Sequence, residues 1–392
     1  MSKYVYPALL SLVLFTVTFA VNLQTPLYGV YTAESNIGST AVTLAFAAYV
    51  VGILPTLFFL GGLSDRVGRC LPIIIALLLC VSATILLVIN PSWGSLFIAR
   101  LLLGVGTGLV MTSGAAYMAE LLDNSKEQFA TLLVTSATSI GFSGGALATS
   151  LSLSLQGPTL MPASFVILFI LVPILVVAFI NMPRVYTPKP VPLFRLPIFP
   201  NKTWVYGISM TLAWATTGMI IAVVPLQLKQ LQLEGWTGLV IFLAIFVGFL
   251  CQPIARKMNN KNSLALGLIL IPVGFLILIL GVWLKSLILI LLGSATTGAA
   301  SYGFTYLAAL SEFASRAPDN RARATAGFFI YAYFGFSIPV IASGAIADIF
   351  GLLPAMIIFN AGLIIVTLII ALIWLRKRNH AYWNLETEPT VK

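Results

Sequence analysis

Charged residues are scarce in this chain of 392 residues: they make up 8% of it, whereas 59% of the residues are hydrophobic. Soluble domains carry about 25% charged residues, so the composition excludes a soluble domain. The formal net charge of +10 does not indicate a nucleic-acid partner, because the basic residues are spread among short loops instead of gathering beside aromatic residues on one face. The expected solvent is a lipid bilayer.

Histidine and cysteine are also rare. The chain has one histidine, His380 near the C-terminus, and three cysteines, Cys70, Cys80 and Cys251. The apolar segments contain no cluster of histidines, cysteines or carboxylates, so we expect no metal site, no cofactor and no acid–base constellation. We also expect no disulfide. The chain is therefore predicted not to be an enzyme.

Long apolar stretches make up most of the sequence. About 20 residues cross a bilayer as a helix, and twelve stretches of about that length are predicted spans: residues 6–30, 40–60, 71–89, 96–120, 129–153, 162–182, 205–228, 237–254, 263–284, 287–312, 324–346 and 351–375. Lys and Arg collect in the termini and the even-to-odd connections; only Lys229 and Lys285 fall on the other side, and Arg100 lies within a span. Because basic residues are retained in the cytoplasm, we expect both termini to be cytoplasmic, in a bacterial or archaeal inner membrane.

A polar connection rich in proline divides the chain into two halves of six spans. We predict a first six-helix bundle at 1–183, a cytoplasmic linker at 184–202, a second six-helix bundle at 203–378 and a cytoplasmic tail at 379–392. The halves share a weak repeat, in which Ala130-Thr131 and Gly141-Phe142-Ser143 recur as Ala324-Thr325 and Gly335-Phe336-Ser337. The expected fold is an all-α membrane protein with two bundles around a central cavity.

A charged turn rich in glycine joins the second and third spans. Its residues Gly61, Leu63, Asp65, Arg66, Gly68 and Arg69 match the pattern G-x-L-x-D-R-x-G-R. This is the signature of the major facilitator superfamily, which the chain resembles over essentially its whole length, although Cys70 stands where the family usually has another basic residue. The resemblance implies a secondary transporter that works by alternating access. It also implies that the turn is a cytoplasmic gate, in which Asp65 ties spans two and eleven together in the outward-open state.

The fourth span contains an arginine, Arg100, followed by small residues, which resembles a second signature of the family. An arginine within the membrane costs about 2.5–3.5 kcal/mol on the insertion scale unless it finds partners or water. The nearest candidate partners by depth are Asn22, Gln24 and Glu34. We favour a functional Arg100, acting in coupling or anion attraction, over a snorkelling or purely structural one. Gly104 and Gly108 share a helix face and are expected to permit close helix packing.

The fifth span carries Gly141, Gly144 and Gly145. These glycines resemble the family's antiporter signature G-P-x-x-G-G, but the proline is missing and the spacing is one residue short. Close packing of this span is therefore expected, while the inference to antiport is weakened.

All eleven acidic residues lie at span ends, in loops or in the tail. A carrier that moves cations or protons through a buried acid ordinarily needs a carboxylate in mid-membrane. If protons are coupled, Glu34 and Asp348 at the outer rim are the candidates, together with Arg100. Glu120 and Glu312 are expected either to pair with Arg69 or Arg323 at the cytoplasmic gate or to be exposed interfacial charges.

Polar tips on apolar side chains in the spans are candidates for lining a substrate cavity: Asn22, Gln24, Tyr28, Tyr49, Tyr117, Trp214, Tyr302, Tyr306, Tyr331 and Tyr333. Tyr302 and Tyr306 share a helix face, whereas Tyr331 and Tyr333 diverge and cannot both point inward. Single aromatic residues of this kind more often serve in packing or in the interfacial belt. As a set, they indicate a moderately hydrophobic solute that is uncharged or weakly anionic.

Taken together, the sequence predicts a monomeric transporter that exports a small amphipathic compound with coupling to protons. The alternatives are uptake or export of a small organic anion or metabolite, with Arg100 as counter-charge, and a transport-inactive membrane sensor that retains the fold. The expected partners are a small-molecule substrate and the lipid bilayer.

Overall fold

A computed structural model describes residues 4–35, 37–122, 127–183, 193–194 and 196–379, and all regular structure in these residues is helical. The first half contains α1 (Val5–Asn22), η1 (Thr25–Leu27), α2 (Tyr28–Ser35), α3 (Ser39–Phe59), α4 (Leu63–Val67), α5 (Cys70–Ile89), α6 (Trp93–Leu121), α7 (Glu127–Gln156) and α8 (Ala163–Ile180). The second half contains α9 (Trp204–Ala222), α10 (Val224–Gln230), η3 (Glu234–Trp236), α11 (Thr237–Ala255), α12 (Asn260–Trp283), α13 (Leu287–Gly298), η4 (Ala299–Thr305), α14 (Tyr306–Ser315), η5 (Pro318–Asn320), α15 (Arg321–Phe350) and α16 (Leu352–Asn379).

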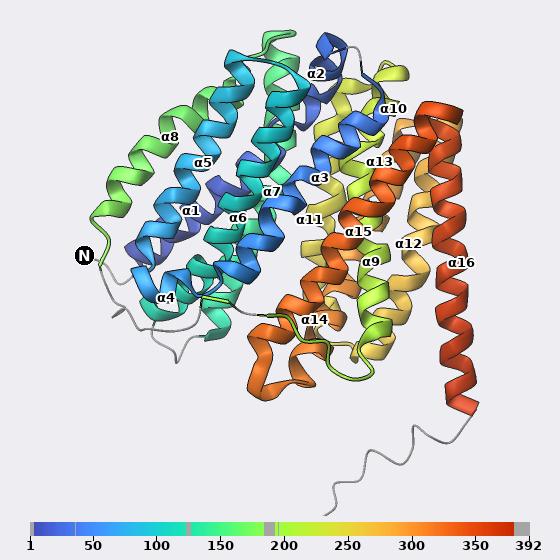
Figure 1. Cartoon of the computed structure of the whole chain (residues 1–392). Helices are drawn as coiled ribbons and strands as arrows, with labels where there is room; N and C mark the ends of the chain where they lie inside the picture. Colours follow the sequence, from blue (N-terminus) through green and yellow to red (C-terminus); the bar gives the residue numbers. More distant parts are fainter. Residues whose placement is uncertain (1–3, 36, 123–126, 184–192, 195, 380–392) are drawn as a thin grey trace, which may run out of the picture.

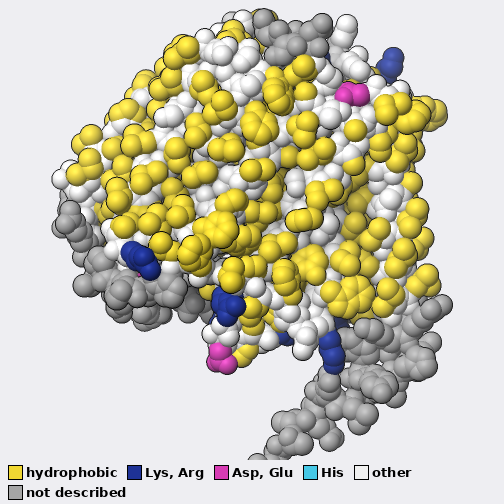
Figure 2. All heavy atoms as spheres, viewed as in Figure 1, with side chains coloured by type: hydrophobic (Ala, Val, Ile, Leu, Met, Phe, Trp, Pro, Cys, Tyr) yellow, Lys and Arg dark blue, Asp and Glu magenta, His cyan; other side chains and the backbone are white. Residues whose placement is uncertain are grey.

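Twelve helical segments of the described chain are long and apolar enough to cross a membrane, which confirms the predicted all-α membrane fold. A helix satisfies its own backbone hydrogen bonds, so it can cross hydrocarbon where water is absent. Large apolar side chains point outward on these helices; Leu155, for example, is 83% exposed. Figure 2 shows apolar side chains covering the middle of one face of the molecule, as expected for a lipid-facing surface.

The helices form two groups that lie side by side, α1 to α8 and α9 to α16 (Figure 1). The main packing between the groups is α3 against α15 and α7 against α11. The connector between the groups crosses one end of the molecule, where the Gly62 amide donates to the Leu193 carbonyl and the Ile198 amide donates to the Arg323 carbonyl. We call this end the linker side and the opposite end the far side. Residues 184–192 and 195 of the predicted linker, and 380–392 of the predicted tail, lie outside the described residues.

Glycines allow the closest helix crossings within the first group. A Cβ atom on Gly104 of α6 would lie 2.1 Å from the Tyr49 carbonyl oxygen of α3, and one on Gly145 of α7 would lie 2.1 Å from the Phe19 carbonyl oxygen of α1. A Cβ atom on Gly141 would lie 2.6 Å from the Phe15 carbonyl oxygen of α1, whereas one on Gly108 would meet the Thr56 side chain at 2.7 Å. Three of the five predicted packing glycines therefore lie at close backbone crossings, and Gly108 lies against a side chain of α3.

Gly144, the fifth predicted packing glycine, is different. A Cβ atom there would meet only the ring of Phe19, at an ordinary distance of 3.7 Å. It lies next to Gly145 in the sequence, so its side-chain position faces away from the crossing.

Three spans are interrupted instead of running as continuous helices. The first span breaks between α1 and α2, next to Pro26, and the seventh breaks between α9 and α10, next to Pro225. The tenth span widens into a π-helix at η4. Proline removes a backbone donor, and π-helical turns are frequent at functional sites. Spans one and seven occupy corresponding positions in the two halves, so both halves carry a break in their first span.

The glycine crossings can be tested with two matched substitutions. Gly104→Ala should lower the melting temperature in detergent, because its methyl group overlaps the Tyr49 carbonyl and overpacking costs about 1–3 kcal/mol. Gly144→Ala is the control and should leave the melting temperature unchanged or slightly higher, since alanine favours a helix over glycine. Equal melting temperatures for the two variants would contradict the crossing described here.

Candidate functional site

On the far side, Asp348 of α15 caps the first turn of α3 in the opposite group. Its carboxylate accepts hydrogen bonds from the Ser39 amide, from the Thr40 amide at 3.0 Å and from the Thr40 hydroxyl. The first amides of a helix have no partner within the helix, and a negative charge is favourable at that end. Gly38 allows the approach, because a Cβ atom there would overlap the carboxylate. A single side chain therefore joins the two groups at this point.

Two further contacts join the groups on the same side. The Gly238 amide, at the start of α11, donates to the Ser150 hydroxyl of α7 at 2.9 Å. The Lys229 ammonium of α10 donates to the Gly29 carbonyl of α2 at 3.0 Å. Like the Asp348 cap, the Gly238 contact satisfies a backbone group at the start of a helix. We call these three contacts the far-side gate.

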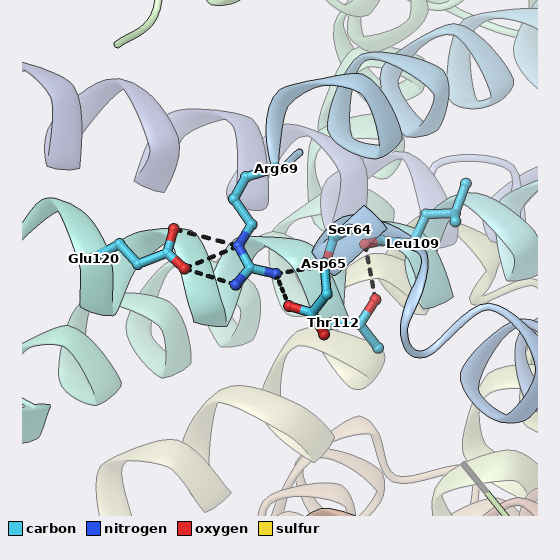
Figure 3. A network of polar contacts seen from close by, with 6 residues as sticks. All are labelled: Ser64, Asp65, Arg69, Leu109, Thr112 and Glu120. Carbon is cyan, nitrogen blue, oxygen red and sulfur yellow. Dashed lines mark hydrogen bonds and ion pairs between the residues drawn. The ribbon is translucent and has the colours of Figure 1, made fainter. Parts of the chain in front are cut away.

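On the linker side, Arg69 contacts two carboxylates of the first group (Figure 3). Its guanidinium lies 2.6 Å from the Asp65 carboxylate and 2.6 Å from the Glu120 carboxylate, and it donates to the Ser64 hydroxyl. Burial acts to lower the pKa of Arg69, but the hydrogen bonds to Glu120 and Asp65 outweigh it, so the pKa lies above its ordinary value. The predicted pairing of Glu120 with Arg69 is confirmed.

The corresponding acid of the second half, Glu312, has a different partner from the one predicted. It pairs with Arg316 one turn later at 2.8 Å and accepts from the Asn260 amide. Arg323, the predicted partner, instead donates to the Leu196 carbonyl of the connector. A partner within the same helix was available at i+4, so the pairing with Arg323 was wrong.

The remaining motif residues of the charged turn between α3 and α5 lie as follows. Gly68 has φ of +89°, which only glycine adopts without strain. Leu63 begins the short helix α4, which packs against α5. Gly61 is buried, and Arg66 is exposed at the surface. The tie between Asp65 and span eleven that the family resemblance implies remains a prediction for the outward-open state.

The helices α6 and α14 also pack mainly against helices of their own group. The main partners of α14 are α9, α11, α12, α15 and η4, all in the second group, and those of α6 are α1, α2, α3, α5 and α7, all in the first group. The hydrogen bonds of the far-side gate cross between the groups at the opposite end. The structure is therefore closed on the far side.

Arg100 is fully buried at the break in the first span. Its guanidinium donates to the Val21 carbonyl at 2.8 Å and lies 4.8 Å from the ring centre of Phe46 and 5.3 Å from that of Tyr49. Val21 is in the last turn of α1, where carbonyls lose their helical partners and a positive charge is favourable. The Nε atom of Arg100 has no hydrogen-bond partner in the described part of the chain. Arg100 thus faces a helix C-terminus and two aromatic rings.

The polar partners that the sequence suggested for Arg100 are engaged elsewhere. The Asn22 side chain donates to the Phe142 carbonyl at 2.7 Å, and the Gln24 side chain donates to the Val21 carbonyl at 2.9 Å. Tyr28 is fully buried on α2, within electrostatic range of Arg100. The side chain of Glu34 lies outside the described residues. The prediction of Asn22 or Gln24 as the partner was wrong, because the Val21 carbonyl at the end of α1 accepts from both Arg100 and Gln24, while Asn22 donates to a carbonyl of α7.

Aromatic side chains from both groups meet around Trp214 of α9. Its ring centre lies 5.1 Å from that of Tyr333, 5.9 Å from that of Tyr302 and 6.5 Å from that of Tyr306. Tyr49 of the first group lies 6.3 Å from Tyr333. We call this set the aromatic cluster, and its members are Phe46, Tyr49, Trp214, Tyr302, Tyr306, Phe329, Tyr333 and Phe336. The Trp214 indole N–H is buried and has no hydrogen-bond partner in the described part of the chain.

The structure separates Tyr333 from Tyr331. Tyr331 packs against Phe199 of the connector and Phe313 of α14, outside the aromatic cluster. Tyr333 lies inside it with Phe329 and Phe336, which are four residues before and three residues after it on α15. That spacing places all three on one helix face. Tyr331 and Tyr333 therefore diverge, as expected from the sequence, and Tyr333 is the one that joins the aromatic cluster.

The Asp348 cap can be tested with one charge removal. Asp348→Asn should open the far side about fivefold more often, because a charge at a helix N-terminus contributes about 1 kcal/mol. The readout is the alkylation rate of a cysteine placed at buried Thr43, with Cys70, Cys80 and Cys251 replaced by serine. Asp319→Asn, on the linker side, is the control and should leave the rate unchanged. A rate unaffected by Asp348→Asn would show that the cap does not hold the gate.

Solved structures that are similar in shape to this chain include transporters. The nucleoside transporter NupG superimposes with a TM-score of 0.75 at 12% sequence identity, over 95% of this chain and 99% of the other. A bacterial homologue of the human lysosomal transporter Spinster, in an inward-facing and unoccupied conformation, superimposes with a TM-score of 0.70 at 13% identity, over 95% of each chain. At these identities the likeness shows the fold alone.

Sequence comparison identifies the family. The chain is 32% identical over 120 residues to the inner membrane transport protein YnfM of Escherichia coli, a region that is 31% of this chain and 27% of that protein. Residues 10–339 match the Major Facilitator Superfamily, whose members are transporters and not enzymes. The match covers most of the sequence, and the chain therefore belongs to the major facilitator superfamily.

Proposed function

We propose that this transporter exports a small amphipathic compound across the inner membrane, coupled to protons, by alternating access between its two helix groups. The observation that carries the proposal is the aromatic cluster, which lies where the groups meet and contains residues of both. Aromatic side chains supply large apolar contact area with a few polar tips. All acidic residues of the sequence lie at span ends, in loops or in the tail, so no carboxylate is expected beside the cluster. These features favour a moderately hydrophobic solute without a positive charge.

The proposed orientation places the linker side in the cytoplasm. Basic residues concentrate on that side, including Arg69, Arg316 and Arg323, and basic residues are retained in the cytoplasm. The structure, closed on the far side, then corresponds to an inward-facing state. Opening of the far-side gate, with closure around the Asp65 turn, would produce the outward-facing state.

In this proposal, Asp348 and Glu34 at the outer rim couple transport to protons. Arg100, deeper in the membrane, takes part in this coupling. The three hydrogen bonds that the Asp348 side chain accepts are strongest while its carboxylate is deprotonated. Protonation therefore weakens the far-side gate, and the stability of the closed state is lost as the pH falls. An acidic exterior would then favour the outward-facing state.

A second candidate function is transport of a flat, uncharged metabolite. The fold is shared with a nucleoside transporter, and the buried indole N–H of Trp214 is a donor without a partner in the described part of the chain. A heteroaromatic ring could stack in the cluster and accept that hydrogen bond. Transport of an organic anion with Arg100 as counter-charge is less favoured, because the guanidinium is already held by Val21 and two rings. The transport-inactive sensor remains the alternative outside transport.

Flux measurements decide between these functions. Compounds that raise the melting temperature of the purified protein are loaded into proteoliposomes and followed with and without a pH gradient. Amphipathic compounds should move against their own gradient only when a pH gradient is imposed. Flux that is indifferent to the pH gradient would contradict proton coupling, and a stabilising compound that is not transported would favour the sensor.

If the aromatic cluster binds the transported compound, substitutions in the cluster should weaken the binding of that compound. Tyr333→Ala should weaken its binding about three- to tenfold, because an aromatic contact contributes about 0.5–1.5 kcal/mol. Tyr331→Ala is the matched control from the same helix and should leave the affinity unchanged. The measurement is a titration of the detergent-purified protein. Equal losses in the two variants, or a loss only in Tyr331→Ala, would place the binding site elsewhere.

A further inference from the structure

The far side carries a cavity of about 670 Å³ at the gate, and no residue of the aromatic cluster lines it. Its walls come from both helix groups: the first-span break and α2, the end of α7 and the loop after it, then α10 and the start of α11. We call this cavity the outer pocket. Its size is in the range of small-molecule sites, which occupy about 300–1,000 Å³.

Two oppositely charged side chains line the outer pocket, Lys229 and Glu234. Lys229 is one of only two lysines in the loops that are predicted to lie outside, where basic residues are depleted. One of its N–H groups donates to the Gly29 carbonyl, which leaves donors for another acceptor. In the described part of the chain neither residue forms an ion pair.

The rest of the lining is apolar or weakly polar. Leu27, Val30, Leu153 and Pro225 supply hydrocarbon surface, and two serine and two threonine side chains supply hydroxyls. A ligand that satisfies both charged residues must carry an ammonium and an anionic oxygen group. A ligand that also covers the apolar lining must have a hydrophobic body.

The outer pocket exists only when the far side is closed, because its walls belong to groups that the gate holds together. Lys229 and Ser150, which make two of the three gate contacts, are themselves lining residues. A ligand that binds one state and not the other shifts the equilibrium toward the state it binds. Occupancy of this pocket therefore stabilises the inward-facing state from outside the membrane.

We propose that the outer pocket is a regulatory site for an amphipathic zwitterion, with Lys229 binding its anionic oxygens and Glu234 its ammonium. A short apolar peptide and the head group of a phosphatidylethanolamine lipid share this chemistry. The site differs from the aromatic cluster, so the proposal does not depend on the identity or direction of the transported compound.

The test uses leucylleucine as probe, with the protein in nanodiscs of phosphatidylglycerol. The dipeptide should bind in a calorimetric titration. Lys229→Gln and Glu234→Gln should each weaken binding about tenfold, the effect of losing a charged hydrogen bond. Lys285→Gln, the other outer lysine, is the control and should not change the affinity. No binding, or equal affinity in all four proteins, would overturn the proposal.

Lys229→Gln also removes a gate contact, so a second variant separates the two effects. Leu153→Trp fills the outer pocket without touching that contact and should abolish binding. Spin labels at Asn90 and Leu284, at the far ends of opposite groups, report the gate. Leucylleucine should increase the population with the shorter label distance in the wild-type protein and leave Leu153→Trp unchanged. A shift to longer distances, or the same shift in Leu153→Trp, would also overturn the proposal.

A third arm distinguishes the two sources of the ligand. Nanodiscs of phosphatidylethanolamine without dipeptide should show the shorter distance if the lipid head group occupies the site. If the distance matches that in phosphatidylglycerol, the ligand is a soluble zwitterion. Glu234→Gln, which leaves the gate contacts intact, should remove whichever effect is observed; persistence of the effect in that variant would contradict the assigned site.

Discussion

A backbone amide or carbonyl without a partner costs several kcal/mol in hydrocarbon, and this constraint governs the structure at every level. It forces each crossing of the membrane to be helical. It also makes every interrupted or terminating helix a site that needs a donor or an acceptor from elsewhere. Arg100 supplies a donor to the end of α1, and Asp348 supplies an acceptor to the start of α3. Ser150 does the same for α11. These three polar side chains therefore act at helix ends.

In the alternating access that we propose, the contacts at helix ends would give the gate two states, closed and open. Asp348 and Ser150 reach helix starts in the opposite group, so closing the far side satisfies these amides and opening it returns them to water. The two contacts occupy equivalent places, since α3 with α15 and α11 with α7 pair the second and fifth spans of opposite halves. The weak sequence repeat thus has a structural counterpart. Each half contributes one helix start and one capping side chain.

The sequence was sufficient for the spans and the charged turn, because hydrophobic length and a dense motif are local signals. It was sufficient for Tyr302 and Tyr306, whose spacing places them on one face toward Trp214. It was not sufficient for the partner of Arg100: the acceptor is a backbone carbonyl exposed by a helix break, and no side-chain pattern records it. The Asp348 cap joins residues 309 apart along the chain, between the Ser39 amide and the carboxylate. Such a contact follows from the packing of the halves, not from local sequence.

The contacts of Arg100 connect the first span with the interface between the two halves. Its guanidinium contacts the break in the first span and the rings of Phe46 and Tyr49, which in turn meet Phe336 and Tyr333 of the second group. One cation therefore contacts both the broken first span and two rings at the interface between the halves. A solute that displaced the rings would change the packing of the cation, and the α1 end would have to adjust. The helix end that Arg100 stabilises lies next to the break in the first span, so a functional role for this residue, as we propose, would be combined with a structural one.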